Sequence, residues 1–167
     1  IDGKWQLVPA NRDRLCTAVL PHMYVSKATA PRFMEFLDEI FEGDPDGHEK
    51  ANLILQHMGY ALQTHSDFEK FAIYLGSGAN GKSVLLNTLK HLLGPANIAA
   101  VQPSKLSNTF HRASLNYKLA NIVTESEQGA KLPAAEIKAL TSGEAMTVDH
   151  KYGQPFVMTP FATLFWA

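Results

Sequence analysis

A chain of 167 residues, 46% of them hydrophobic, is long enough to bury one globular core without disulfides. The 15 Lys and Arg residues nearly balance the 16 Asp and Glu residues, so the net charge of -1 excludes a strongly basic nucleic-acid binder. Cys16 is the single cysteine, which excludes a disulfide framework and a multi-cysteine metal site within the chain and is typical of a reducing compartment.

The sequence contains no apolar run long enough to cross a bilayer and no signal peptide, so we expect no membrane association. It begins at Ile1 and ends on the apolar run FATLFWA. We therefore expect it to be a fragment of a longer protein.

Residues 1–68 are predicted to form an irregular and helical N-terminal segment. The first 30 residues show little periodicity, although GKWQLV is compatible with a short strand. Apolar residues then recur at three- and four-residue spacing over 31–42 and again over 48–63, which predicts two helices joined by the turn GDPDG. Phe33, Phe36 and Phe41 lie on the apolar side of the first helix, so we expect them in the core rather than on a base-stacking platform.

Residues 69–167 are predicted to form an α/β core. The run FAIYL at 71–75 suits a strand buried on both faces. Further strands are expected near 98–101, at 119–124 and at 162–167, with helices at 82–94 and 133–143 and a β-hairpin within 145–158 whose tip is near 149–153. This alternation of strands and helices predicts a parallel sheet.

A glycine-rich loop lies between the first of these strands and the following helix. Its sequence fits G-x-x-x-x-G-K-[ST], the pattern of a loop that binds the phosphates of a nucleoside triphosphate. Glycines let several backbone N–H groups point at phosphate oxygens, and the start of the helix adds its own free N–H groups. Lys82 is expected to reach the β- and γ-phosphates, and Ser83 to place its hydroxyl on Mg²⁺. The predicted nucleotide-binding residues are Gly76, Ser77, Gly78, Ala79, Asn80, Gly81, Lys82 and Ser83.

Two glutamates follow the buried run at 119–124, in the segment NIVTESE. An acid at the end of a neighbouring strand is what a nucleoside triphosphatase needs to hold the metal's water shell and orient the attacking water. Glu125 is the candidate for the metal site, and Glu127 is the candidate for a base that positions water. The alternative is that both are solvated residues of a loop.

The loop GSGANGKS, with Asn80 immediately before Gly-Lys-Ser, resembles the phosphate loop of superfamily 3 helicases. More narrowly, the chain resembles the C-terminal helicase part of phage and plasmid primase-helicases over about residues 30–167. The segments that carry the resemblance are RFMEFLDEIFEGD, ILQHMGYALQTHSDFEKFAIYLGSGANGKSVLLNTL and LANIVTESEQGAKLPAAEIKALTSGEAMTVDHKYGQPFVMTPFATLFWA.

The resemblance implies an AAA+-like P-loop ATPase core, with ATP and Mg²⁺ as cofactors. It implies rings, usually hexamers, that encircle DNA and translocate on a single strand in the cytoplasm of a bacterial host. By position, Lys82 and Ser83 match the phosphate-loop pair and Glu125 matches the acidic strand end. Lys138 lies in the segment KALTSGE, and His150 and Lys151 fall near the hairpin tip that touches DNA in this superfamily.

The chain also departs from the family's pattern. Ser142-Gly143-Glu144 stands where the family usually has Gly-Gly-Asp, and FATLFWA stops where a sensor asparagine is expected. The arginine finger would lie beyond Ala167. Arg112, the one arginine after the loop, is not assigned to that role.

Two other classes of function remain open. A different P-loop enzyme, such as a small-molecule kinase, would need arginines to clamp the transferring phosphoryl group, and the chain has almost none after the loop. The second signature loop of a transporter ATPase and the N-K-x-D base reader of a GTPase are both missing from the sequence. A nucleotide-binding interaction domain without turnover is the non-enzymatic alternative. From the residues alone, His150 and Lys151 would be a solvated surface pair, and the resemblance favours contact with DNA.

Overall fold

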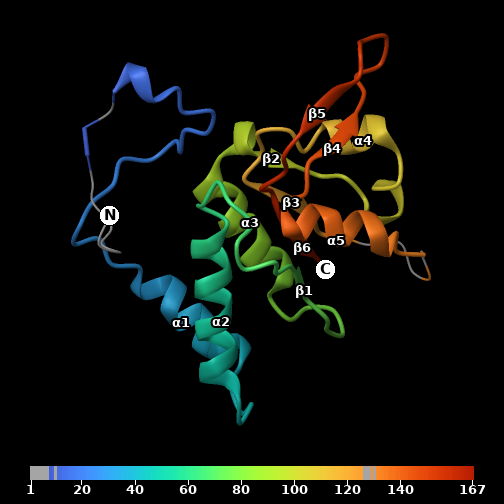
Figure 1. Cartoon of the computed structure of the whole chain (residues 1–167). Helices are drawn as coiled ribbons and strands as arrows, with labels where there is room; N and C mark the ends of the chain where they lie inside the picture. Colours follow the sequence, from blue (N-terminus) through green and yellow to red (C-terminus); the bar gives the residue numbers. More distant parts are fainter. Residues whose placement is uncertain (1–7, 10, 126–128, 130) are drawn as a thin grey trace.

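The computed structural model describes residues 8, 9, 11–125, 129 and 131–167 (Figure 1). The short strand expected in GKWQLV lies almost wholly outside the described residues. The helices are η1 (Arg12–Arg14), α1 (Pro31–Ile40), α2 (Gly47–Tyr60), α3 (Lys82–Leu93), η2 (Pro95–Asn97), η3 (Pro103–Lys105), α4 (Thr109–Ala113) and α5 (Ala134–Ser142). The strands are β1 (Ala72–Ile73), β2 (Ile98–Ala99), β3 (Ala120–Val123), β4 (Met146–Val148), β5 (Phe156–Met158) and β6 (Thr163–Trp166).

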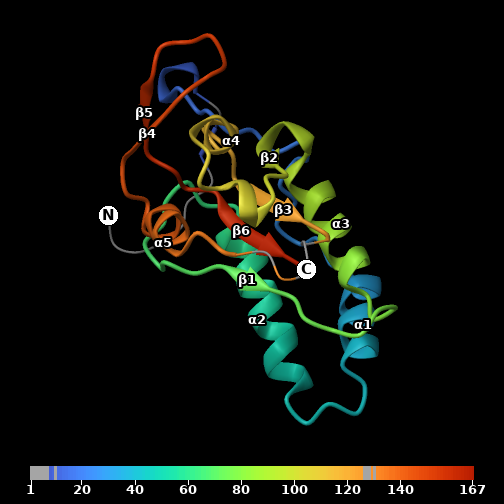
Figure 2. The ribbon, with the colours of Figure 1, turned by 90° about the vertical axis from the view of Figure 1, so that its right-hand side faces the viewer.

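Four strands form one parallel sheet in the order β1-β6-β3-β2, so the expected α/β fold with a parallel sheet is confirmed. β6, the last strand in the sequence, lies between β1 and β3 (Figures 1 and 2). Ile73, Trp166 and Val123 stand level with one another across these three strands. Strands β4 and β5 form the expected antiparallel hairpin, which projects from the body of the molecule.

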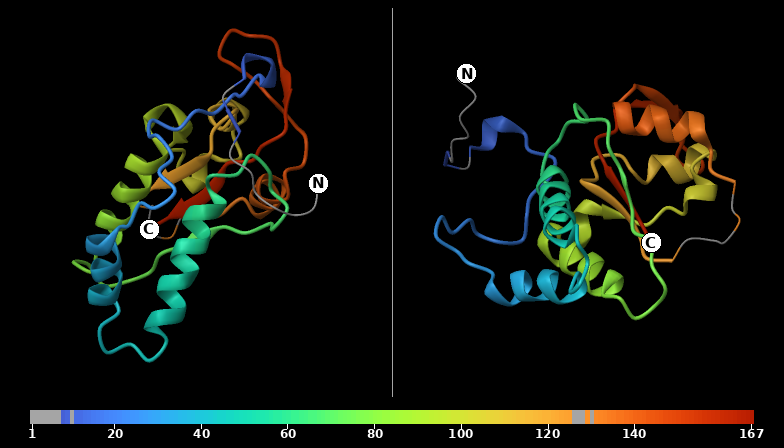
Figure 3. Two further views of the ribbon diagram at one scale, coloured as in Figure 1. Left: turned by 90° about the vertical axis from the view of Figure 1, so that its left-hand side faces the viewer. Right: turned by 90° about the horizontal axis from the view of Figure 1, so that it is seen from below.

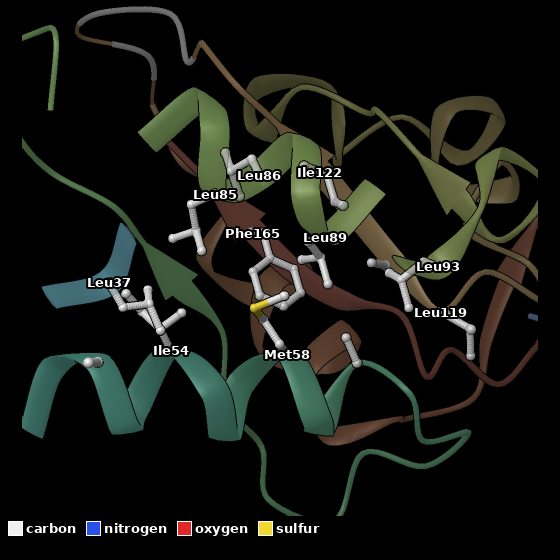
Figure 4. Close-up of a cluster of buried hydrophobic side chains, with 13 residues drawn as sticks. Leu37, Ile54, Met58, Leu85, Leu86, Leu89, Leu93, Leu119, Ile122 and Phe165 are labelled. Atoms are coloured by element: carbon white, nitrogen blue, oxygen red, sulfur yellow. The ribbon is translucent and has the colours of Figure 1, made fainter. Parts of the chain in front are cut away.

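Helices cover both faces of the sheet (Figure 3). On one face, α1, α2 and α3 share a buried cluster with Ile122 of β3 and Phe165 of β6. Figure 4 shows Phe165 between the side chains of α2 and those of α3. On the other face, Leu164 and Trp166 of β6 pack with α5, α4 and the β4–β5 hairpin. This alternation along β6 follows from the period of two in a strand, and it makes β6 the centre of both cores.

Glycines set the ends of two helices as the sequence predicts. Gly94 follows the last residue of α3 with φ +79°, and Gly143 follows α5 with φ +68°. Glycine tolerates this left-handed conformation, in which a side chain would be strained, so each helix stops there. The phenylalanines of the first predicted helix are core residues as expected: Phe33, Phe36 and Phe41 are half-buried against the cluster on that face.

Two expectations about local structure were wrong. The run at 71–75 was expected to be buried on both faces, but β1 is an edge strand of two residues in which Ile73 is 47% exposed. The apolar composition of this run reflects packing on one face only. Helix α4 was not expected in the polar stretch after β2; its start is fixed by Asn108, whose side chain accepts hydrogen bonds from the N–H groups of Phe110 and His111. Over the described residues, no helix combines the length and apolar character needed to cross a bilayer.

Candidate nucleotide site and hairpin

The glycine-rich loop joins the end of β1 to the start of α3, at the edge of the sheet where the parallel strands end. Gly78 and Gly81 adopt positive φ angles of +55° and +81°, as does Ala79 at +52°. The first hydrogen bond of α3 runs from the N–H of Leu85 to the carbonyl of Gly81. The N–H groups of residues 82–84 are therefore available to a ligand, as is usual at a helix N-terminus.

Lys82 is held inside this loop by two oxygen atoms. Its Nζ donates to the carbonyl oxygen of Gly76 at 2.9 Å and to the side-chain oxygen of Asn80 at 2.9 Å. Gly76 lies so close to Asn80 that a Cβ at Gly76 would overlap Nδ2 of Asn80 and force that side chain to move. The structure thus brings the first glycine, the asparagine and the lysine of the predicted loop into direct contact.

Helix α1 packs against the loop at Gly81. A Cβ at Gly81 would lie 2.7 Å from Cγ2 of Ile40 and 3.1 Å from the ring of Phe36. The backbone of the loop therefore packs directly on α1, a helix that lies far earlier in the chain. The sequence predicts that Phe36 is a core residue, but it carries no signal for the contact of Phe36 with the glycine-rich loop.

Glu125 lies on the same edge of the sheet as the loop. It follows β3 by two residues, and Gly76 follows β1 by three, while the last residues of these strands stand level across β6. With strands about 4.8 Å apart, the two strand ends are separated by about 10 Å. The backbone carbonyl of Glu125 accepts a 3.0 Å hydrogen bond from Nε2 of Gln102, and its carboxylate is exposed. Glu127 lies outside the described residues.

Ser83 stands in the first turn of α3 with an exposed side chain. Within the described ranges, no group of three or more His, Cys, Asp or Glu residues could hold a metal ion. Mg²⁺ usually keeps several waters and binds through one or two carboxylates together with phosphate oxygens of a substrate, so a Mg²⁺ site does not need such a group.

The β4–β5 hairpin carries a tight turn at its tip. The N–H of Gly153 donates to the carbonyl of His150 at 2.8 Å, which closes the turn around Lys151 and Tyr152. Tyr152 is 96% exposed and has φ +65°, a conformation that turns normally reserve for glycine or asparagine. Nζ of Lys151 lies 5.1 Å from the centre of the Tyr152 ring, a cation–π contact. The sequence pattern singles out His150 and Lys151 but not Tyr152. The positive φ of Tyr152 is visible only in the structure.

His150, the other residue predicted near the tip, packs against the hairpin itself. The ring of His150 stacks on Phe156 of β5, with centroids 4.8 Å apart. Directly after β4, at the tip end of the hairpin, the hydroxyl of Thr109 in α4 donates to Asp149 Oδ2 at 2.7 Å. This bond links the hairpin to α4.

Lys138 and Arg112 lie outside both the glycine-rich loop and the hairpin. Lys138 is exposed on α5, and its carbonyl oxygen accepts hydrogen bonds from Thr141 and Ser142. The side chain of Arg112 is only 12% exposed and donates to the carbonyl oxygens of Leu106 and Ser107. Arg112 therefore has a structural role in the polar stretch before α4.

Two solved structures of the C-terminal region of NrS-1 are similar to this chain. The apo structure of residues 305–718 has 16% sequence identity and a TM-score of 0.65, with 84% of this chain and 34% of that chain covered. The A form apo structure of the same region has 17% identity and a TM-score of 0.65, with 84% and 33% covered. This chain spans about a third of the length of these structures, and at such identities the likeness shows the fold alone.

Residues 74–167, more than half of the chain, match a family of unknown function, DUF5906. The matched range begins at the last residues before the glycine-rich loop and includes α3, Glu125, α5, the hairpin and β6. The chain therefore belongs to the family of unknown function DUF5906.

Proposed function

We propose that this chain is the P-loop, AAA+-like ATPase core of a DNA helicase from a phage- or plasmid-type replication protein. It binds ATP and Mg²⁺ at residues 76–83, and hydrolysis drives translocation on single-stranded DNA. The observation that carries the proposal is the contact of Lys82 with Gly76 and Asn80 at the start of α3, on the edge of the sheet where parallel strands end. Open parallel sheets bind ligands at that edge.

The loop has the features that a triphosphate requires. Free N–H groups at the start of α3 and an ammonium group lie together, and the positive end of the helix dipole points the same way. The close approach at Gly76 is the type of cradle that a side chain would fill. In the nucleotide complex, Lys82 would keep Gly76 and Asn80 as oxygen partners and donate its third N–H to a phosphate oxygen, and Ser83 and Glu125 would hold the magnesium ion and its water.

The contact with DNA is proposed for the hairpin. Lys151 supplies a charge for a phosphate at the tip, and the exposed Tyr152 supplies a face on which a base stacks. His150 supports the tip through its stacking on Phe156. In the proposed hexameric ring, one such tip from each subunit would surround the strand, which is compatible with a net charge of -1. Lys138, on α5 rather than on the hairpin, is a second candidate for contact with DNA.

A second candidate function is nucleotide binding without turnover. The observation in its favour is that Arg112, the one arginine after the loop, is engaged by backbone carbonyls. Its side chain is only 12% exposed, which argues against a role on a transferring phosphoryl group and against a small-molecule phosphotransferase.

The two functions are separated by measuring ATP hydrolysis with and without single-stranded DNA. The measurement uses both the 167-residue chain and a longer protein that contains it, each with a Lys82→Ala control. The helicase proposal expects hydrolysis that DNA stimulates in the longer protein and that Lys82→Ala abolishes, with little turnover by the shorter chain. Binding of ATP with no hydrolysis in either protein supports the second function instead.

A further inference from the structure

A large cavity adjoins the glycine-rich loop. Its volume is about 1270 Å³, and its wall is formed by α2, by the segment from residue 63 to residue 75, and by Asn80 and Lys82 of the loop. The two loop side chains that contact each other thus also line this cavity. A ligand whose phosphates lie at the loop would have the rest of its structure directed at this space.

The wall of the cavity is mainly aromatic and aliphatic. Tyr60 of α2 meets Phe68 edge to face, with ring centroids 5.3 Å apart, and Phe68 is 64% exposed. Phe71 contributes a second exposed ring, at 5.2 Å from Trp166, and Ile73 of β1 contributes an aliphatic surface. An exposed apolar surface of this kind, next to a charged loop, is typical of a small-molecule site.

We propose that this cavity binds the nucleobase and ribose of the nucleoside triphosphate whose phosphates the loop holds. The inference rests on the proposed function, and it adds the part of the site that the phosphate-loop motif does not describe. Because apolar and aromatic surface makes up most of the wall, the base is held mainly by stacking and burial.

Gly59 offers a way to fill the cavity without disturbing the fold. It lies in α2 on the cavity wall, and a Cβ built on it meets no atom within 4 Å. Gly59→Trp adds a large ring at the cavity wall, whereas the matched control Gly59→Ala adds one methyl group that meets no atom within 4 Å. Both substitutions favour the helix over glycine, so folding is not at risk.

The experiment compares the binding of ATP and of inorganic tripolyphosphate, both with Mg²⁺, by titration calorimetry. The proposal expects the wild-type chain to bind ATP at least about tenfold more tightly than tripolyphosphate, the ratio that one stacked base supplies. Gly59→Trp should abolish that ratio and leave tripolyphosphate affinity unchanged, and Gly59→Ala should keep the ratio. Phe68→Ala, which removes an exposed ring, should reduce it.

Two results overturn the inference while leaving the loop assignment standing. One is equal affinity of the wild-type chain for ATP and tripolyphosphate, and the other is an unchanged ratio in Gly59→Trp. If Gly59→Trp instead alters the sedimentation of the chain and leaves the ratio unchanged, the cavity is a contact between copies, and the inference is wrong. Failure of the wild-type chain to bind either compound overturns the proposed function, and the inference with it.

Discussion

Nζ of Lys82 donates a 2.9 Å hydrogen bond to the side-chain oxygen of Asn80, two residues earlier in the chain. The same nitrogen donates to the carbonyl of Gly76, so Asn80 and Gly76 together hold the ammonium group over the loop. A lysine ammonium on a flexible four-carbon stem otherwise samples many positions. Asn80, the residue that distinguishes this loop from the generic pattern, thus fixes the position of the Lys82 charge in the free protein.

The close approach at Gly76 gives the first prediction. Gly76→Ala forces the side chain of Asn80 away, because the new Cβ would overlap its amide nitrogen, and the lysine loses a partner. Since a hydrogen bond to a charged group contributes about 1.5–3 kcal/mol, affinity for Mg·ATP should fall by at least about tenfold. The free energy of unfolding should change little, because the displaced atom ends a flexible side chain.

Ser107→Ala is the control for this prediction, because Ser107 is an exposed serine outside the glycine-rich loop. Calorimetry on both variants should show normal ATP binding for Ser107→Ala and weak binding for Gly76→Ala. Equal affinities in the two variants would show that the position of Asn80 is irrelevant to the nucleotide.

The strained turn at the hairpin tip gives the second prediction. Tyr152 holds φ +65° at an exposed position, which costs about 1 kcal/mol for a residue with a Cβ. Tyr152→Gly should therefore leave the chain as stable or more stable, while removing the proposed stacking face. Affinity for single-stranded DNA, measured by fluorescence anisotropy, should fall by about five- to tenfold, as expected for loss of one stacked base.

The control for the tyrosine is Val157→Thr, a change on the same hairpin at an exposed position of β5. Its DNA affinity should match that of the wild type. If Tyr152→Gly binds DNA as well as the wild type, the ring is not a contact, and the strain at the tip has another cause.

The bond between the hairpin and α4 gives the third prediction. Thr109→Val replaces the hydroxyl that donates to Asp149 by a methyl group of similar size, and leaves a half-buried carboxylate without this partner. The free energy of unfolding should fall by about 1–2 kcal/mol, measured by urea denaturation. Thr147→Val, at an exposed position of β4, is the matched control, and its stability should stay within about 0.5 kcal/mol of the wild type. If Thr109→Val lowers the free energy of unfolding no more than Thr147→Val does, the Thr109–Asp149 hydrogen bond does not stabilise the fold.

Much of the fold follows from local sequence. The helices α1, α2, α3 and α5 follow from apolar spacing, and the ends of α3 and α5 follow from Gly94 and Gly143. The strands β3 and β6 follow from short continuous apolar runs. The order of the strands does not follow in this way. That β6 inserts between β1 and β3 is a long-range outcome, and it is why β1 is a half-exposed edge rather than a central strand.

The candidate site likewise has one part that the local sequence predicts and another that depends on contacts between distant segments. The loop residues are consecutive, so the motif predicts that they lie together, but it does not predict that Lys82 bonds to Gly76 and Asn80. The packing of Gly81 on Ile40 and the cavity beside α2 join segments far apart in the sequence, and no local pattern encodes them. Helix α4 is too short for a periodic signal, and only its Asn108 cap marks its start.

Partial burial of His57 predicts how the free energy of unfolding depends on pH. Burial lowers the pKa of His57 below its ordinary value of 6.5, so the folded protein keeps the ring neutral where the unfolded chain protonates it. Because the unfolded state then binds more protons, the free energy of unfolding should fall as the pH drops below about 6.5, and should level off below the folded-state pKa. In His57→Phe, which keeps a ring between Tyr60 and Phe165, this contribution disappears.

The check is urea denaturation of both proteins at about pH 7.5 and about pH 5, values on either side of the ordinary histidine pKa. The wild type should lose more stability than His57→Phe between the two conditions. An identical loss in both proteins would mean that His57 titrates normally in the folded state.

The most direct test of the account is the affinity of the 167-residue chain for Mg·ATP, measured by calorimetry in the wild type, Lys82→Ala and Lys90→Ala. Lys90 lies in the last turn of the same helix, so its replacement removes the same charge away from the loop. The account predicts saturable binding by the wild type and Lys90→Ala, and a loss of at least about tenfold in Lys82→Ala, in line with a hydrogen-bonded charge. Equal affinity in all three proteins would contradict the assignment of residues 76–83 as the phosphate site.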